Sequence, residues 1–323
     1  MLSVIRGVSL GGWLVLERYI RPSLFALTTC DIHGIFINSN SSSNDNDNET
    51  TVLPPSFITR DQGIVHNNNN NNNECEPIPD PYPVDQWTLI QAFDTRELAR
   101  EYLRHHWENF VTWDDLYQIK YTAGLDVVRV PIGHWIVLQE GERSYYTDHI
   151  DNDNGATKVE PFIGGEWAYF QRVVRWCREL RLQIYVDLHT APGSQNGFDN
   201  SGRANATGPT CIGWRSSQET NVERTIDCIR KIAHRIAADG MQDVVTGFGI
   251  LNEPFIDCGM DLARRFNNQA ADIVREVLGQ DVTIIIGDLF NSSRWDGFWV
   301  DRGNTLLDSH YYQGRCCVVQ RNV

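Results

Sequence analysis

The sequence has no long hydrophobic run and few basic residues. No stretch approaches the roughly 18 consecutive apolar residues that indicate a membrane-spanning helix. Lys and Arg number 28 against 42 Asp and Glu, which gives a formal net charge of −14 at pH 7. Nucleic acids and anionic membranes bind clustered basic residues, so we expect this chain to bind neither.

Sequence motifs that mark cofactor sites are also missing. The eight cysteines include no CxxC pair, and no GxGxxG turn or phosphate-binding loop follows the first strand-like run. We therefore expect no metal and no cofactor. The strand-like run 4–10 leaves no room for a signal peptide, so either the protein is intracellular or its N-terminal part is missing from this sequence. Four Asn-x-Ser/Thr sequons favour secretion, although short sequons also arise by chance: Asn40, Asn48, Asn205 and Asn291.

The chain does have enough apolar sequence for one large domain. With 323 residues and 41% hydrophobic content, it can bury the core of a single barrel-sized domain, which we expect to be monomeric. Residues 28–85 interrupt this domain with Asn-, Ser- and Asp-rich runs, including seven consecutive Asn at 67–73. Because such runs bury too little apolar surface to offset the entropy of ordering, we expect 28–85 to be a disordered insertion in a loop.

Short apolar runs alternate with amphipathic segments along the rest of the chain. We expect strands at 5–10, 125–133, 184–188, 244–251, 282–287 and 305–307, and helices at 94–110, 112–124, 165–181, 216–239 and 261–278. This alternation favours an α/β fold, a TIM (β/α)8 barrel that is incomplete, with about six of its eight units present. A doubly wound open sheet is the competing architecture.

The stretch Gly247–Phe255 carries the strongest candidate site. Its apolar residues indicate a buried strand that Pro254 ends, which places Asn252 and Glu253 at the carboxyl end of the strand. A Glu in that position of a barrel, beside an amide, suits general acid–base work on a sugar. The alternative is that Asn-Glu-Pro is only a turn after a strand.

Three other residues are conspicuous because of the apolar sequence around them. Arg129 lies between valines, and a buried Arg is rare unless paired, so we expect it to have a carboxylate partner. Glu17 lies in an apolar segment and is either a satisfied structural carboxylate or a ligand for sugar hydroxyls. His189 follows the third strand and is either a functional group or a partner in a hydrogen bond that stabilises the loop.

Five segments together resemble the exo-β-1,3-glucanases (glucan 1,3-β-glucosidases) of glycoside hydrolase family 5. They are RGVSLGGWLVLERYIRPSLF, VVRVPIGHW, IYVDLHTAPGSQNGFDNSG, GILNEPF and LDSHYYQ, in this order between residues 6 and 313. The resemblance implies a barrel that hydrolyses β-glucosidic bonds with retention of configuration and releases glucose from the ends of β-1,3-glucan. It implies a β-glucan as the partner and an extracellular or cell-wall location.

The same resemblance assigns roles residue by residue. It makes Glu253 the acid/base, Asn252 its neighbour at the sugar 2-hydroxyl, and Arg129 the group that steadies the carboxylate of the nucleophile. It adds three residues at strand ends: His189, His310 and Tyr312. It also implies that Glu17 and Tyr19 bind the terminal glucose and that Phe198 and Asp199 belong to the loop that forms the wall of its pocket. Retention needs two carboxyls about 5–5.5 Å apart, one protonated and one ionised when the substrate binds.

The family pattern breaks near the C-terminus. The family's nucleophile lies in a Glu-Trp-Gly-type motif beyond the sixth strand, and residues 314–323 do not resemble the family. We therefore expect residues 1–323 to be a truncated catalytic barrel without its nucleophile. Glu166 precedes Trp167 but begins a helix before the third strand, so it is no substitute. Two alternatives stay open: a glucan-binding pseudoenzyme, and another family 5 enzyme such as an endo-β-glucanase or mannanase.

Overall fold

The computed structural model describes residues 4–34, 76–78, 82–147, 157–204, 214, 220–298 and 302–310. Tyr312 and most of the expected insertion lie outside the described residues. Both ends of the insertion are described and structured. Helix α2 (Thr29–His33) begins with a capping box at Thr28, and Thr28 also forms an isolated bridge with Pro77. Helix α2 is also held by hydrogen bonds from Thr29 N to Glu76 O and from Asp94 N to Ile32 O. The disordered insertion itself stays a prediction.

Six parallel strands form one sheet, in the same order as along the chain. They are β1 (Gly7–Ser9), β2 (Val127–Ile132), β5 (Gln183–Leu188), β6 (Val245–Gly249), β7 (Thr283–Gly287) and β8 (Thr305–Asp308). A doubly wound sheet would reverse its strand order at a switch point, whereas sequential parallel strands are the arrangement of a (β/α)8 barrel. The predicted strands and the incomplete barrel are confirmed.

Helices connect the strands close to where the sequence predicts them. They are α1 (Pro22–Phe25), α3 (Gln86–Gln91), α4 (Arg96–Asn109), α5 (Trp113–Tyr117), α6 (Trp167–Leu180), α8 (Thr220–Ala238) and α9 (Met260–Leu278). Helix α5 continues as a π-helical turn, Gln118–Thr122, which ends before Gly124 at φ 66°. The sequence patterns miss α1, α2, α3 and a small antiparallel hairpin of β3 (Tyr145–Thr147) and β4 (Thr157–Val159). None of the helices in the described part of the chain combines the length and the apolar character needed to cross a membrane.

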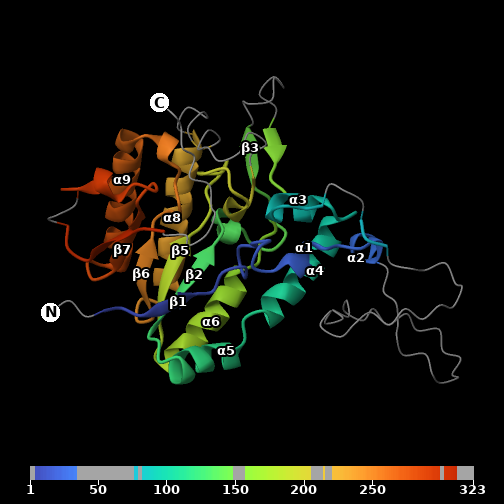
Figure 1. Cartoon of the computed structure of the whole chain (residues 1–323), viewed down its shortest axis with the longest axis horizontal. Helices are drawn as coiled ribbons and strands as arrows, with labels where there is room; N and C mark the ends of the chain where they lie inside the picture. The colour runs from blue at the N-terminus through green and yellow to red at the C-terminus, as the bar shows by residue number, and fades with distance from the viewer. Residues whose placement is uncertain are drawn as a thin grey trace, which may run out of the picture.

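The sheet and the helices share one apolar core. Figure 1 shows α6, α8 and α9 running alongside the strands, with α4 and α5 packed next to α6. The inner strands are fully buried at alternating positions such as Val128, Val130 and Val186. This core fixes the strands rigidly, so that side chains at their carboxyl ends are held at defined positions relative to one another.

The two outermost strands of the sheet have a different environment. Within the described residues, β1 and β8 pair only on their inner sides. Val8 on β1 and Leu306 and Leu307 on β8 are 37%, 41% and 40% exposed, whereas Phe248 on β6 is fully buried. Such open edges are places where a further strand can add.

Candidate active site

The turn after β6 holds Asn252 and Glu253 in a strained conformation. The backbone of Glu253 has a φ of 43°, which is uncommon for a residue other than glycine. Side-chain amides from the loop after β5 support it. Gln195 Nε2 donates to the carbonyl oxygens of His189 and Asn252 at 2.9 Å each, and Asn196 Nδ2 donates to that of Glu253 at 3.1 Å. Two neighbouring strand ends thus fix the position of Glu253 together.

A closed ring of contacts joins Arg129, Asp187, His189 and Asn252. Arg129 Nη2 lies 3.0 Å from Asp187 Oδ2 and donates to Asn252 Oδ1 at 2.7 Å. His189 Nδ1 donates to Asp187 Oδ2 at 2.7 Å, which leaves His189 Nε2 as an acceptor 3.5 Å from Asn252 Nδ2. The ring sets the tautomer of His189 and turns the Asn252 oxygen toward Arg129.

The predicted carboxylate partner of Arg129 is therefore Asp187. Burial lowers the pKa of Arg129, but the carboxylates of Asp187 and Asp308 raise it, and the net shift is upward. Burial raises the pKa of Asp187, but Arg129 and the hydrogen bond from His189 lower it further, and the net shift is downward. Both groups stay ionised at neutral pH. The contact of Arg129 with a nucleophile stays a prediction.

Both oxygens of the Glu253 carboxyl contact side chains. Oε2 accepts a hydrogen bond from Asn200 Nδ2 at 3.0 Å, and Oε1 lies 2.5 Å from His310 Nδ1. The other ring nitrogen of His310, Nε2, lies 3.0 Å from Asp308 Oδ2. Burial lowers the pKa of His310, but hydrogen bonds to Asp308 and Glu253 raise it, to about 10. His310 is therefore an imidazolium at neutral pH that donates to both carboxylates.

The expected sugar-binding residues near the N-terminus contact each other. Glu17 is buried; its Oε1 accepts from Gly12 N at 3.0 Å and its Oε2 from the Tyr19 hydroxyl at 2.5 Å. These are the contacts of a structural carboxylate. Its charge also acts on Arg129, so Glu17 lies near the ring of contacts described above. Tyr19 is 69% exposed. Sugar binding by this pair stays a prediction.

Phe198 and Asp199 lie on the loop that carries Asn200. Phe198 packs edge-to-face against Phe255 and Phe290, with ring centroids 5.8 and 6.2 Å apart. Asp199 Oδ1 accepts from the backbone N–H of Asn200 at 3.0 Å, and burial raises the pKa of Asp199. The loop thus brings both expected residues beside the amide that contacts Glu253.

Sequence reasoning missed Asp187, Asn200 and Asp308, although each contacts an expected site residue. A signal existed for two of them, because Asp187 precedes His189 by two residues and Asp308 precedes His310 by two. Residues two apart on an extended strand point to the same side, so the repeated Asp-x-His spacing predicts an Asp–His hydrogen bond at each strand end. Asn200 has no such signal.

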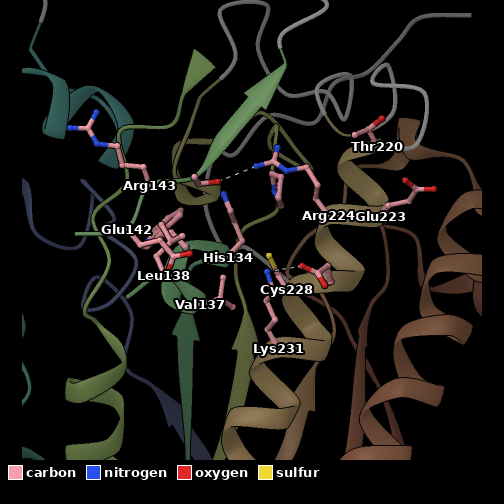
Figure 2. Close-up of a pocket in the computed structure, with 14 residues that line it drawn as sticks. His134, Val137, Leu138, Glu142, Arg143, Thr220, Glu223, Arg224, Cys228 and Lys231 are labelled. Carbon is pink, nitrogen blue, oxygen red and sulfur yellow. Dashed lines mark hydrogen bonds and ion pairs between the residues drawn. The ribbon is translucent and has the colours of Figure 1, made fainter. Parts of the chain in front are cut away.

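One pocket among the described residues lies away from these groups. It has a volume of about 420 Å³ and lies between the turn His134–Val137 and α8. Figure 2 shows α8 side chains from Thr220 to Lys231 facing it. Arg224 Nη2 there pairs with Glu160 Oε1 at 2.9 Å, and Lys231 Nζ with Asp227 Oδ2 at 2.8 Å. These ion pairs stabilise the surroundings of α8, and none of the expected catalytic residues lines this pocket. Among the described residues, no cluster of His, Cys, Asp and Glu could hold a metal ion.

Comparison with curated proteins gives long matches. The glucan 1,3-beta-glucosidase of Lachancea kluyveri is 30% identical over 318 residues, which is 96% of this chain and 56% of the relative. A protein of Aspergillus fumigatus named "Probable glucan 1,3-beta-glucosidase A" is 33% identical over 313 residues, again 96% of this chain and 56% of the relative. The chain thus spans about half the length of the curated relatives it matches.

Comparison with solved structures supports the fold, and a family model covers most of the chain. AoRut matches with a TM-score of 0.62 at 16% identity, over 99% of this chain and 70% of that one. The rutinosidase from Aspergillus niger matches with a TM-score of 0.59 at 15% identity, over 95% and 69%. At this identity the likeness concerns the fold alone. The model of the family described as Cellulase (glycosyl hydrolase family 5) matches residues 91–316, which include the Arg129 ring, Glu253 and His310. The chain belongs to glycosyl hydrolase family 5.

Proposed function

We propose that this chain carries the acid/base part of a retaining glucan exo-1,3-β-glucosidase. The observation that carries the proposal is the placement of Glu253. Its carboxyl is buried at the carboxyl end of β6, with Asn252 beside it in the ring of contacts to Arg129 and His189. The names of the curated relatives support β-1,3-glucan as the substrate.

The contacts support different roles for Asn252 and Glu253 in the first chemical step. Asn252 Oδ1 is held by Arg129, so its Nδ2 is the group that can donate to the sugar 2-hydroxyl. His310 Nδ1 donates its proton to Glu253 Oε1 in the 2.5 Å contact between them. Acid catalysis needs this proton on the oxygen of the leaving group, and the same carboxylate then acts as base toward water in the second step.

Retention also requires a second carboxylate as the nucleophile. Two carboxylates in the described site, Asp187 and Asp308, already contact cationic partners. We infer that a Glu outside the described residues supplies the nucleophile, as the family resemblance implies. Arg129, with its raised pKa, would keep that carboxylate ionised.

We further propose that the protein acts outside the cell or in the cell wall. Cys30 and Cys258 each form a disulfide, and disulfides persist in oxidising compartments. Asn291, within a sequon, is partly exposed on a turn. The curated relatives from Aspergillus fumigatus and Lachancea kluyveri are named as glucan 1,3-beta-glucosidases, and β-glucan is a polymer of the cell wall.

The test compares the chain alone with the chain joined to the C-terminal part of the Aspergillus fumigatus relative; this fusion is called the joined protein below. We expect the joined protein to release glucose from laminarin faster than from β-1,6-glucan, carboxymethylcellulose or mannan, with the β-anomer appearing first by NMR. We expect the chain alone to release none, because we infer from the family resemblance that the nucleophile is not among residues 1–323. First appearance of the α-anomer, or preference for mannan, would contradict the proposal. Laminarin binding without any glucose release by the joined protein would favour a pseudoenzyme.

A further inference from the structure

The pocket of about 420 Å³ beside α8 lies outside the active site described above and has no role in the proposed chemistry. Figure 2 shows the side chains of His134, Leu138 and Glu142 on one side of it, facing those of α8. Helix α8 contributes six residues at helical spacing, which places them on one face of the helix: Thr220, Glu223, Arg224, Asp227, Cys228 and Lys231. The walls of the pocket therefore include a regular helix that packs on the core.

The charged side chains around this pocket balance one another. Three are basic and three are acidic: Arg143, Arg224 and Lys231, and Glu142, Glu223 and Asp227. Arg224 and Lys231 are also held in ion pairs. A site with balanced charge attracts neither anions nor cations over a distance, but its charged groups supply both donors and acceptors of hydrogen bonds. The pocket therefore suits a neutral, polar ligand.

Two buried polar groups beside the pocket lack hydrogen-bond partners. His134, which lines the pocket, and Glu160 are 4% and 2% exposed. Burial lowers the pKa of His134, so its imidazole is neutral at pH 7. Burial raises the pKa of Glu160, but His134 and Arg224 lower it further, to about 2, so this carboxyl is ionised. His134 Nε2 and Glu160 Oε2 lie 3.6 Å apart, too far for a hydrogen bond, and neither atom has another partner among the described residues.

A single hydroxyl group satisfies both of these atoms. Thr190 Oγ1 lies 2.8 Å from His134 Nδ1 and can donate to it, so Nε2 carries the proton and faces the Glu160 carboxylate. The missing group must accept from Nε2–H and donate to Oε2, which a water molecule or a ligand hydroxyl does at once. A carboxylate has no proton to donate, and an ammonium group has no lone pair with which to accept.

The remaining wall of the pocket is apolar and includes Val137, Leu138 and Pro192. A sugar ring has apolar C–H faces and a rim of hydroxyls, and small-molecule sites of about 300–1,000 Å³ combine an apolar wall with a few polar groups. We propose that this pocket is a second saccharide site, outside the catalytic site, which takes one glucose unit of a β-glucan. The choice of a β-glucan rests on the proposed function.

The direct test is an NMR titration of the 323-residue chain with laminaribiose. We expect shifts of the backbone amides at residues 134–144 and 220–231 and of the His134 Nε2–H proton. Titrations with sodium acetate and with ethylammonium chloride should leave these signals unchanged. Shifts caused by either ion and not by the sugar would overturn the saccharide site. No shift with any of the three would overturn it as well, because water alone would then occupy the pocket.

A substitution at the rim tests whether the sugar enters the pocket. Glu223→Trp places a large ring at an exposed position of the rim and leaves the ion pairs of Arg224 and Lys231 in place. We expect it to weaken laminaribiose binding at this site about tenfold, which corresponds to about 1.4 kcal/mol. Glu276→Trp is the matched control, because Glu276 is exposed on α9 and lies outside the pocket. Unchanged binding in Glu223→Trp, or equal weakening by both variants, would overturn the site.

Glucose release by the joined protein separates this site from the catalytic proposal. Release from laminarin without amide shifts at 134–144 and 220–231 would overturn the second saccharide site while the catalytic proposal stands. Shifts at these residues without any glucose release would support the second site and contradict the catalytic proposal.

Discussion

Replacing Asp187 by Asn tests the ring of contacts that positions Asn252. The Asp187 side chain is 5% exposed and lies 3.0 Å from Arg129 Nη2, whose side chain is 26% exposed. The substitution keeps the shape of the side chain and removes its charge, which leaves the Arg129 cation in a poorly solvated place. Removing one partner of a buried ion pair costs about 3–5 kcal/mol, out of a total stability of about 5–15 kcal/mol. Asp308 remains 3.9 Å from Arg129, so we expect the lower end, about 3 kcal/mol.

Urea unfolding at pH 7 measures this change in the free energy of unfolding. The pKa of Asp187 is lowered in the folded chain, so its contribution is present above the ordinary pKa of 3.8 and is lost as the pH falls through the lowered value. The difference between Asp187→Asn and the parent should therefore be constant at neutral pH and shrink in strong acid.

Asp243→Asn is the matched control for this measurement. Asp243 pairs with Arg178 at 2.6 Å, but the two side chains are 56% and 42% exposed. Exposed pairs contribute about 0–1 kcal/mol, so this variant should unfold close to the parent. If Asp187→Asn cost no more than Asp243→Asn, the ring would not hold Arg129 as argued.

Two further predictions concern His310 and the insertion. NMR titration should find His310 with a pKa of about 10, and Asp308→Asn should lower this pKa toward 6.5. Because the pKa is raised in the folded chain, the contribution of His310 to the free energy of unfolding is fully present below pH 6.5 and is lost as the pH rises through 10. A pKa near 6.5 in the parent would contradict the contacts. Deleting residues 38–73, which begin and end in Asn-, Ser- and Asp-rich runs, should change the midpoint of urea unfolding little. A deletion variant that does not fold would show the segment to be structural.

The strands and the end of β6 were predictable because their signals are local. The run Val127–Ile132 is apolar except for Arg129 and rich in β-branched residues, which is typical of a strand buried on both faces, and Pro254 marks where β6 cannot continue. Burial of Arg129 among valines also required a carboxylate partner. These inferences need only the neighbouring residues in the sequence.

The contacts that tune the site were not predictable in the same way. Asn200 and Glu253 are 53 residues apart, and their hydrogen bond exists only because the loop after β5 folds over the tip of β6. The left-handed backbone of Glu253 is likewise enforced by Gln195 and Asn196 and has no local sequence signal. The same holds for Phe290, whose left-handed backbone, with a φ of 58°, depends on the carboxylate of Asp288.

The most direct test of the central claim is the effect of Glu253→Ala on two leaving groups in the joined protein. Pre-steady-state glycosylation rates should be measured with laminaribiose and with 2,4-dinitrophenyl β-glucoside. An acid catalyst matters for a poor leaving group such as a sugar and hardly at all for dinitrophenolate. We expect Glu253→Ala to lower the laminaribiose rate by about 100-fold or more and to leave the aryl glucoside rate nearly unchanged. Equal losses on both substrates would contradict the assignment of Glu253 as the acid.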